Sequence, residues 1–167
     1  ALVGESMMLM EISQIYQAEK AHDEAIITSG EALERLNSLA QKEAKEADLS
    51  VVLNPLERQE GASELLELIG QAQAHLGLAH KQRGDKAVGA RHLLAAWRIQ
   101  ATAIGETHDE TRATLNHLRE AMREARRGRA RGNARVLEMV TEEMRRLVDY
   151  DKRADDRRCG ATSSCNR

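Results

Sequence analysis

Residues 76–109, LGLAHKQRGDKAVGARHLLAAWRIQATAIGETHD, have the pattern of two closely packed helices. Gly77 falls on the inner side of a first predicted helix, and Gly89 on the inner side of a second. Gly84 and Asp85 separate the two, because glycine commonly ends a helix and aspartate commonly starts one. Glycines on facing sides leave room for two backbones to approach each other. The stretch therefore predicts a helix–turn–helix unit.

The composition favours helices along the whole chain. The 167 residues, 41% of them hydrophobic, suit one domain with a real core. The chain has no phenylalanine, two tyrosines, one tryptophan and one proline, whereas sheets are enriched in aromatic and β-branched residues. We therefore expect an all-α protein. The net charge of -2 gives no overall attraction to nucleic acid or to a membrane.

Two further features bear on location. No apolar run approaches the roughly 20 residues of a membrane-spanning helix, and the first residues lack the pattern of a secretion signal. We expect a cytoplasmic protein without a membrane span. Cys159 and Cys165 lie in a polar tail, where two reduced thiols are expected and a small disulfide is the alternative.

Apolar residues at helical intervals predict helices on both sides of the opening stretch. The predicted helices cover 5–20, 23–47, 55–83, 86–104 and 136–150, with another starting after residue 107. Asp23 is the expected N-cap of the second helix. Thr107 and Glu110 have the T-x-x-E spacing of a capping box.

The predicted chain has four parts. Residues 1–48 form a first helix pair, and 49–55 are an interruption that ends at Pro55. Residues 56–152 contain further helix pairs, a basic linker and a closing amphipathic helix. Residues 153–167 form a polar tail that is expected to be disordered.

The spacing of these helices resembles a known repeat family. The residue pattern that begins at Leu76 recurs 42 residues later at Leu118, and a weaker copy of it covers 7–36. This pattern resembles the tetratricopeptide repeat (TPR), and GETHDETRATLNHL is similar to the longer repeats of kinesin light chains. The resemblance implies a TPR-like α-solenoid, a short right-handed superhelical stack of antiparallel helix pairs.

In such a stack the first helix of each pair lines the concave side, where a partner protein binds. The resemblance places the following residues there: Gln14, Gln17, Gln71, Ala74, Lys81, Asn116, Glu120 and Arg123. Asn116 lies in LNHL, which resembles the LNNL of kinesin-light-chain repeats, whose asparagine binds the backbone of an extended peptide. The alternative for the whole set is ordinary solvated polar residues.

The segment 123–135, REARRGRARGNAR, holds six arginines against one glutamate. Besides Arg123, these are Arg126, Arg127, Arg129, Arg131 and Arg135. Such a basic patch could contact RNA, anionic lipid or the acidic surface of tubulin, and the alternative is a solvated linker. No aromatic residue interleaves with the arginines, which disfavours RNA recognition by base stacking.

The sequence gives no positive sign of catalysis, a cofactor or a metal. The six histidines form no i,i+4 pair and no H-E-x-x-H motif. Neither glycine-rich stretch has the order of a phosphate-binding loop, and no nucleophile elbow occurs. We expect His80 to pack between helices and His108 to cap a helix or pack in a turn.

The sequence therefore predicts a non-enzymatic adaptor or scaffold for protein–protein interaction. The kinesin resemblance and the basic patch favour a cytoskeletal, microtubule or ciliary (axonemal) assembly, with tubulin among the candidate partners. Two alternatives remain open. One is a helical regulatory module of a larger enzyme or transcription regulator, and the other is an RNA-associated helical repeat.

Overall fold

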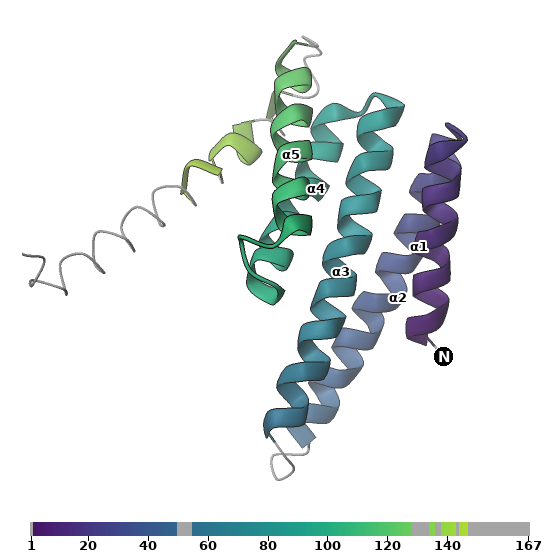
Figure 1. Ribbon diagram of the computed structural model, residues 1–167, viewed down its shortest axis with the longest axis vertical. Helices are drawn as coiled ribbons and strands as arrows, with labels where there is room; N and C mark the ends of the chain where they lie inside the picture. Colours follow the sequence, from purple (N-terminus) through teal and green to yellow (C-terminus); the bar gives the residue numbers. More distant parts are fainter. Residues whose placement is uncertain (1, 50–54, 128–133, 136–137, 143, 147–167) are drawn as a thin grey trace, which may run out of the picture.

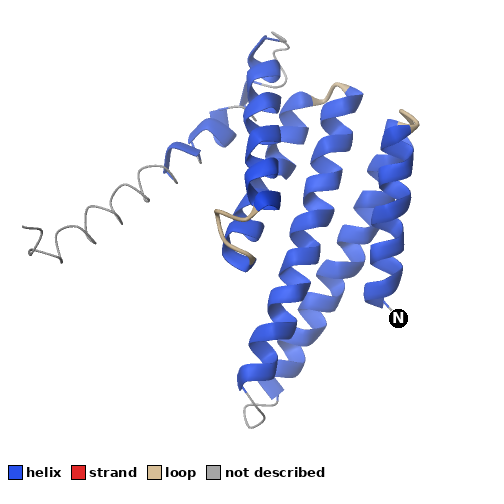
Figure 2. Cartoon of the chain, viewed as in Figure 1, coloured by secondary structure: helices blue, strands red, loops and turns tan. Residues whose placement is uncertain are grey.

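The computed structural model describes residues 2–49, 55–127, 134–135, 138–142 and 144–146, with only the backbone described for 44–49 and 55–63. Five helices follow one another: α1 Leu2–Ala18, α2 His22–Leu49, α3 Pro55–Arg83, α4 Lys86–Ala103 and α5 Asp109–Arg127. Shorter helical stretches cover 138–142 and 144–146. Figure 2 shows helices and turns but no strand in these described ranges, so the prediction of an all-α fold is confirmed.

Consecutive helices pack against each other along the chain. The largest contacts join α1 to α2, α2 to α3, α3 to α4, and α4 to α5. In addition, α3 contacts both α1 and α5. Figure 1 accordingly shows α1, α3 and α5 side by side, with α3 in the middle. The first helices of the predicted pairs therefore form one layer.

The closest helix crossing is the one that the opening stretch predicts, between α3 and α4. A Cβ atom added to Gly89 would lie 2.7 Å from the carbonyl oxygen of Gly77 and 2.9 Å from the backbone nitrogen of Lys81. A Cβ atom on Gly77 would lie 2.8 Å from Cγ of Leu93. Real Cβ atoms do not come this close to backbone atoms, so glycine is required here and the predicted close approach is confirmed.

The turn between α3 and α4 also follows the prediction in part. Gly84 has φ +110°, a left-handed conformation that favours glycine after a helix. Asp85 occupies the N-cap position of α4, and its carbonyl oxygen accepts the Gly89 N–H. Its carboxylate, however, makes no capping hydrogen bond and is bonded by Arg83 instead. Asp85 is therefore the N-cap residue of α4, as expected, but it makes no side-chain hydrogen bond to that helix.

The other two predicted N-caps lie at neighbouring residues. The carbonyl of Ala21, not that of Asp23, accepts the first hydrogen bond of α2, so Asp23 lies in the first turn of that helix. The carbonyl of His108 accepts the first bond of α5, and its Nδ1 accepts the Glu110 N–H at 3.4 Å. The Thr107 capping box is therefore wrong in register, whereas the capping role predicted for His108 is confirmed.

Two apolar clusters hold the helices together. The first joins α1, α2 and α3 through Met10, Ala32, Leu33, Leu36, Leu65, Ile69, Ala72 and Leu76. The second joins α4, α5 and the stretch 138–142 through Ala90, Leu93, Leu94, Leu118, Ala121, Met122 and Val140. Trp97 and Met144 pack against the second cluster. The described part of the predicted closing helix therefore packs on the α4–α5 pair.

Several predictions fall on residues that the structure does not describe. They concern Arg129, Arg131, both cysteines, most of the interruption at 49–55 and the tail 153–167. Within the described ranges, the helices are too short or too polar for any of them to cross a membrane.

Candidate functional site

An open cleft of about 390 Å³ lies on the layer formed by α1, α3 and α5. Side chains of α4 reach it from behind this layer. Its lining consists of Met7, Met10, Glu11 and Gln14 of α1; Gln71, Ala74, His75 and Leu78 of α3; Leu93 and Gln100 of α4; and Glu110, Ala113, Thr114 and His117 of α5. Four of the five helices therefore contribute to one site.

Three of the predicted partner-binding residues line this cleft together. They are Gln14, Gln71 and Ala74. Gln17 lies beside it, one turn further along α1, and its Nε2 donates to the carbonyl oxygen of His75 at 3.3 Å. These four residues come from the segments where the repeat pattern placed the inner face.

Amide side chains connect the walls of the cleft. Gln14 Nε2 lies 3.3 Å from Nε2 of His75, which joins α1 to α3. Gln71 Nε2 donates to Oε1 of Glu67 and to Oε2 of Glu110, each at 3.4 Å, which joins α3 to α5. Burial lowers the pKa of His75, so its imidazole is neutral at pH 7. His75 therefore adds no charge to the wall of the cleft at that pH.

Lys81 and Glu120 are engaged with each other rather than with the cleft. The Lys81 ammonium pairs with the Glu120 carboxylate, joining α3 to α5, and the Lys81 side chain is only 13% exposed. Hydrogen bonding to Lys81 holds the pKa of Glu120 below its usual value. This pair fastens α5 to α3 beyond the lining residues of the cleft.

The remaining two predicted residues lie elsewhere on α5. Asn116 is exposed and is not a lining residue of the cleft. Arg123 lines a separate cleft of about 470 Å³. That second cleft also contains Arg119, Met122, Arg126, Arg127 and Met144. The structure thus divides the predicted set among the cleft, an ion pair and a basic surface, and Asn116 belongs to none of the three.

The basic surface contains those residues of the predicted basic patch that the structure describes on α5. Arg126 and Arg127 are exposed, and Arg126 also donates to Oγ1 of Thr141 at 3.2 Å. Arg135 is exposed as well. Among the described residues, no carboxylate lines the cleft of about 470 Å³, and Met122 and Met144 contribute apolar side chains to it.

Gln100 is one of the lining residues of the main cleft that the sequence pattern missed. It lies on α4, a second helix, where the repeat pattern places residues away from the concave side. The side chain nevertheless reaches the cleft because Gly70 of α3 has none: a Cβ there would lie 3.0 Å from Cγ of Gln100. A glycine inside a predicted helix was the available signal, since it marks a close approach.

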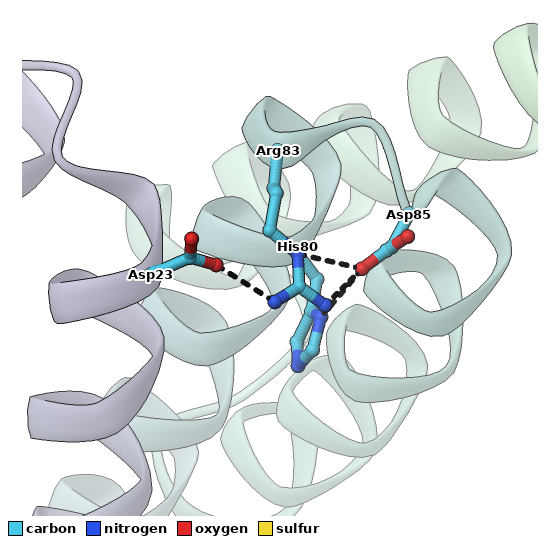
Figure 3. Close-up of polar contacts among 4 residues, drawn as sticks. All are labelled: Asp23, His80, Arg83 and Asp85. Carbon is cyan, nitrogen blue, oxygen red and sulfur yellow. Dashed lines mark hydrogen bonds and ion pairs between the residues drawn. The ribbon is translucent and has the colours of Figure 1, made fainter.

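A cluster of charges joins α2 to the turn between α3 and α4. Figure 3 shows the Arg83 guanidinium between two carboxylates, 2.9 Å from Oδ1 of Asp23 and 2.7 Å from Oδ2 of Asp85. His80 Nδ1 lies 3.6 Å from the same oxygen of Asp85. Arg83 therefore binds the carboxylates of Asp23 and Asp85, the two residues that the sequence predicted as helix caps.

Within the described residues, no three or more His, Cys, Asp or Glu side chains are grouped so that they could hold a metal ion. Comparisons with protein-family models, curated proteins and solved structures found no match to this chain. The geometry of the clefts is thus the basis for assigning a function.

Proposed function

We propose that this chain is a non-enzymatic adaptor or scaffold that holds an extended segment of another protein against α1, α3 and α5. The observation that carries this proposal is the cleft of about 390 Å³, because one bound segment could touch all three helices there. Adjacent α-helices commonly present such grooves to peptides. We further propose that the helix pairs form a TPR-like superhelical stack.

The chemistry of the lining supports recognition of a peptide. Gln14 and Gln71 carry both donors and acceptors, which suit the N–H and C=O groups of an extended backbone. Met7, which is 46% exposed, adds a flexible apolar contact at the edge. Such a mixture of amides and apolar side chains is typical of surfaces that bind protein segments.

The proposal is tested by blocking the cleft. The exposed side chain of Ala113 lies in the lining, so Ala113→Trp should fill the site and reduce crosslinking to cellular partners. Ala18→Trp, at the exposed end of α1, is the matched control. Unchanged crosslinking by Ala113→Trp, with partner contacts mapped to the outer faces of α2 and α4, would rule out the cleft as the binding site.

The basic surface favours a second contact, with an acidic protein surface. One cleft is lined by Arg119, Arg123, Arg126 and Arg127, with no carboxylate among its described lining residues. Opposite charge speeds and orients association. We propose tubulin or another acidic component of a cytoskeletal or ciliary assembly as this partner, which would place the protein in the cytoplasm. Binding to polymerised tubulin should fall steeply as salt is raised, and a salt-insensitive complex would exclude these arginines.

A further inference from the structure

Two residues that line the cleft each have a buried polar atom without a hydrogen-bond partner, Nδ1 of His75 and Oε1 of Gln100. The side chain of Gln100 is 2% exposed, and its Oε1 accepts no hydrogen bond. Buried acceptors in folded proteins are normally paired, because an unpaired one has lost its water without compensation. Gln100 is also one of the residues that line the open cleft. The partner that Oε1 of Gln100 lacks is a hydrogen-bond donor.

The charges around the cleft select the kind of donor. Glu11 and Glu110 line it, whereas no lysine or arginine is among its lining residues. The hydrogen bond from Gln71 holds the Glu110 carboxylate at the cleft wall. Because the cleft contains carboxylates and an unpaired carbonyl, a positively charged donor is favoured there and an acidic group is repelled.

The apolar lining adds a requirement for an aliphatic stem. Met10, Leu78 and Leu93 contribute side chains to the same cleft. Lysine and arginine combine a long hydrocarbon stem with several N–H donors and carry no acceptor. An apolar side chain would fill this space but leave Oε1 of Gln100 unpaired.

We propose that the cleft binds a lysine or arginine side chain of an extended partner segment. The stem lies against Met10 and Leu78, and the charged head donates to Oε1 of Gln100 and to Glu110. This proposal rests on the proposed function, since it names the side chain that the binding groove selects.

A random library of 12-residue peptides, displayed on phage and selected on the full chain, tests the proposal. Peptides that bind the full chain but not Ala113→Trp should share a lysine or arginine at one position. Replacing that residue by norleucine in a synthetic fluorescent peptide should weaken binding about tenfold or more, as expected for a lost charged hydrogen bond.

A thermodynamic cycle then assigns the effect to Gln100. Gln100→Met should weaken the lysine peptide about tenfold but leave the norleucine peptide nearly unchanged. Gln82→Met, at an exposed site on α3, is the matched control. Glu110→Gln, on the surface of α5, supplies a second variant that does not disturb the buried packing.

The outcomes separate the two proposals. If every selected peptide also bound Ala113→Trp, or if no peptide were selected, both the proposed function and this inference would be overturned. Selection of Ala113-dependent peptides without a shared basic residue would overturn only the inference. The inference alone would also be overturned if Gln100→Met and Glu110→Gln each weakened binding of the lysine peptide and of the norleucine peptide equally.

Discussion

The imidazole ring of His80 stacks on that of His92, with the ring centroids 5.5 Å apart and an angle of 6° between the planes. His80 lies on α3 and His92 on α4, so the stack joins the two helices that also meet at their glycines. His92 Nδ1 lies 2.9 Å from Oε1 of Gln73 on α3. The packing role expected for His80 is confirmed, and its partner is a second histidine.

This stack should make stability depend on pH. Burial lowers the pKa of His80, and burial together with the neighbouring His80 lowers the pKa of His92 to about 4. The unfolded chain binds protons more readily than the folded chain below pH 6.5. The free energy of unfolding should therefore fall from pH 6.5 towards pH 4.

The variant His92→Phe keeps an aromatic ring but removes one titrating group. Urea unfolding at pH 7.5 and pH 4.5 should show a smaller loss of stability in this variant than in the wild type. Parallel losses in the two proteins would contradict an important contribution from His92.

The crossing of α3 and α4 should not tolerate a methyl group at Gly89. Gly89→Ala should lower the free energy of unfolding by about 1–3 kcal/mol, because the added atom meets the Gly77 carbonyl and the Lys81 backbone. Gly30→Ala is the control, since a Cβ there meets nothing within 4 Å and alanine favours helix by up to about 1 kcal/mol. Equal effects of the two substitutions in urea unfolding would disprove the steric argument.

A buried pair of hydroxyls should show coupling. Oγ of Ser13 on α1 and Oγ of Ser29 on α2 are 2.5 Å apart, and both side chains are fully buried. Ser13→Ala should cost about 1 kcal/mol because it removes the partner of the buried Ser29 hydroxyl. Ser29→Ala should cost less, because Ser13 Oγ still donates to the carbonyl oxygen of Ala25 at 3.1 Å. The double variant should cost less than the sum, and strict additivity would show that the pair is not coupled.

The stretch 138–142 should dock through one residue. Val140 is 2% exposed in the cluster with α4 and α5, whereas the adjacent Met139 is 62% exposed. Val140→Asp should release the segment, because a buried carboxylate without a partner is strongly disfavoured. Limited proteolysis should then cut this segment faster in Val140→Asp than in the control Met139→Asp. Equal cleavage of the two variants would show that the docking does not depend on Val140.

The helices could be predicted well because their signals are local. Gly84, with its positive φ, and Pro55, the first residue of α3, end and start helices through their own backbone geometry. Capping was predicted less well. Asp23 and Asp85 are ordinary capping residues, but Arg83 binds both, and Asp23 is 60 residues away from it in sequence.

The candidate site could be predicted only where it follows the repeat spacing. Gln14, Gln71 and Ala74 have positions along their own helices that bring them to the cleft. The Lys81–Glu120 pair depends on the register between α3 and α5, which no local pattern specifies. Gln100 reaches the cleft only because a residue of another helix, Gly70, leaves space for it.

The central place of α3 has a mechanical consequence. Apart from chain neighbours, the main contacts of the described helices join α3 to α1 on one side and to α5 on the other. The α1–α2 pair and the α4–α5 pair are thus connected mainly through α3. A segment bound across the cleft would contact α1 and α5 at once and so crosslink the two helix pairs.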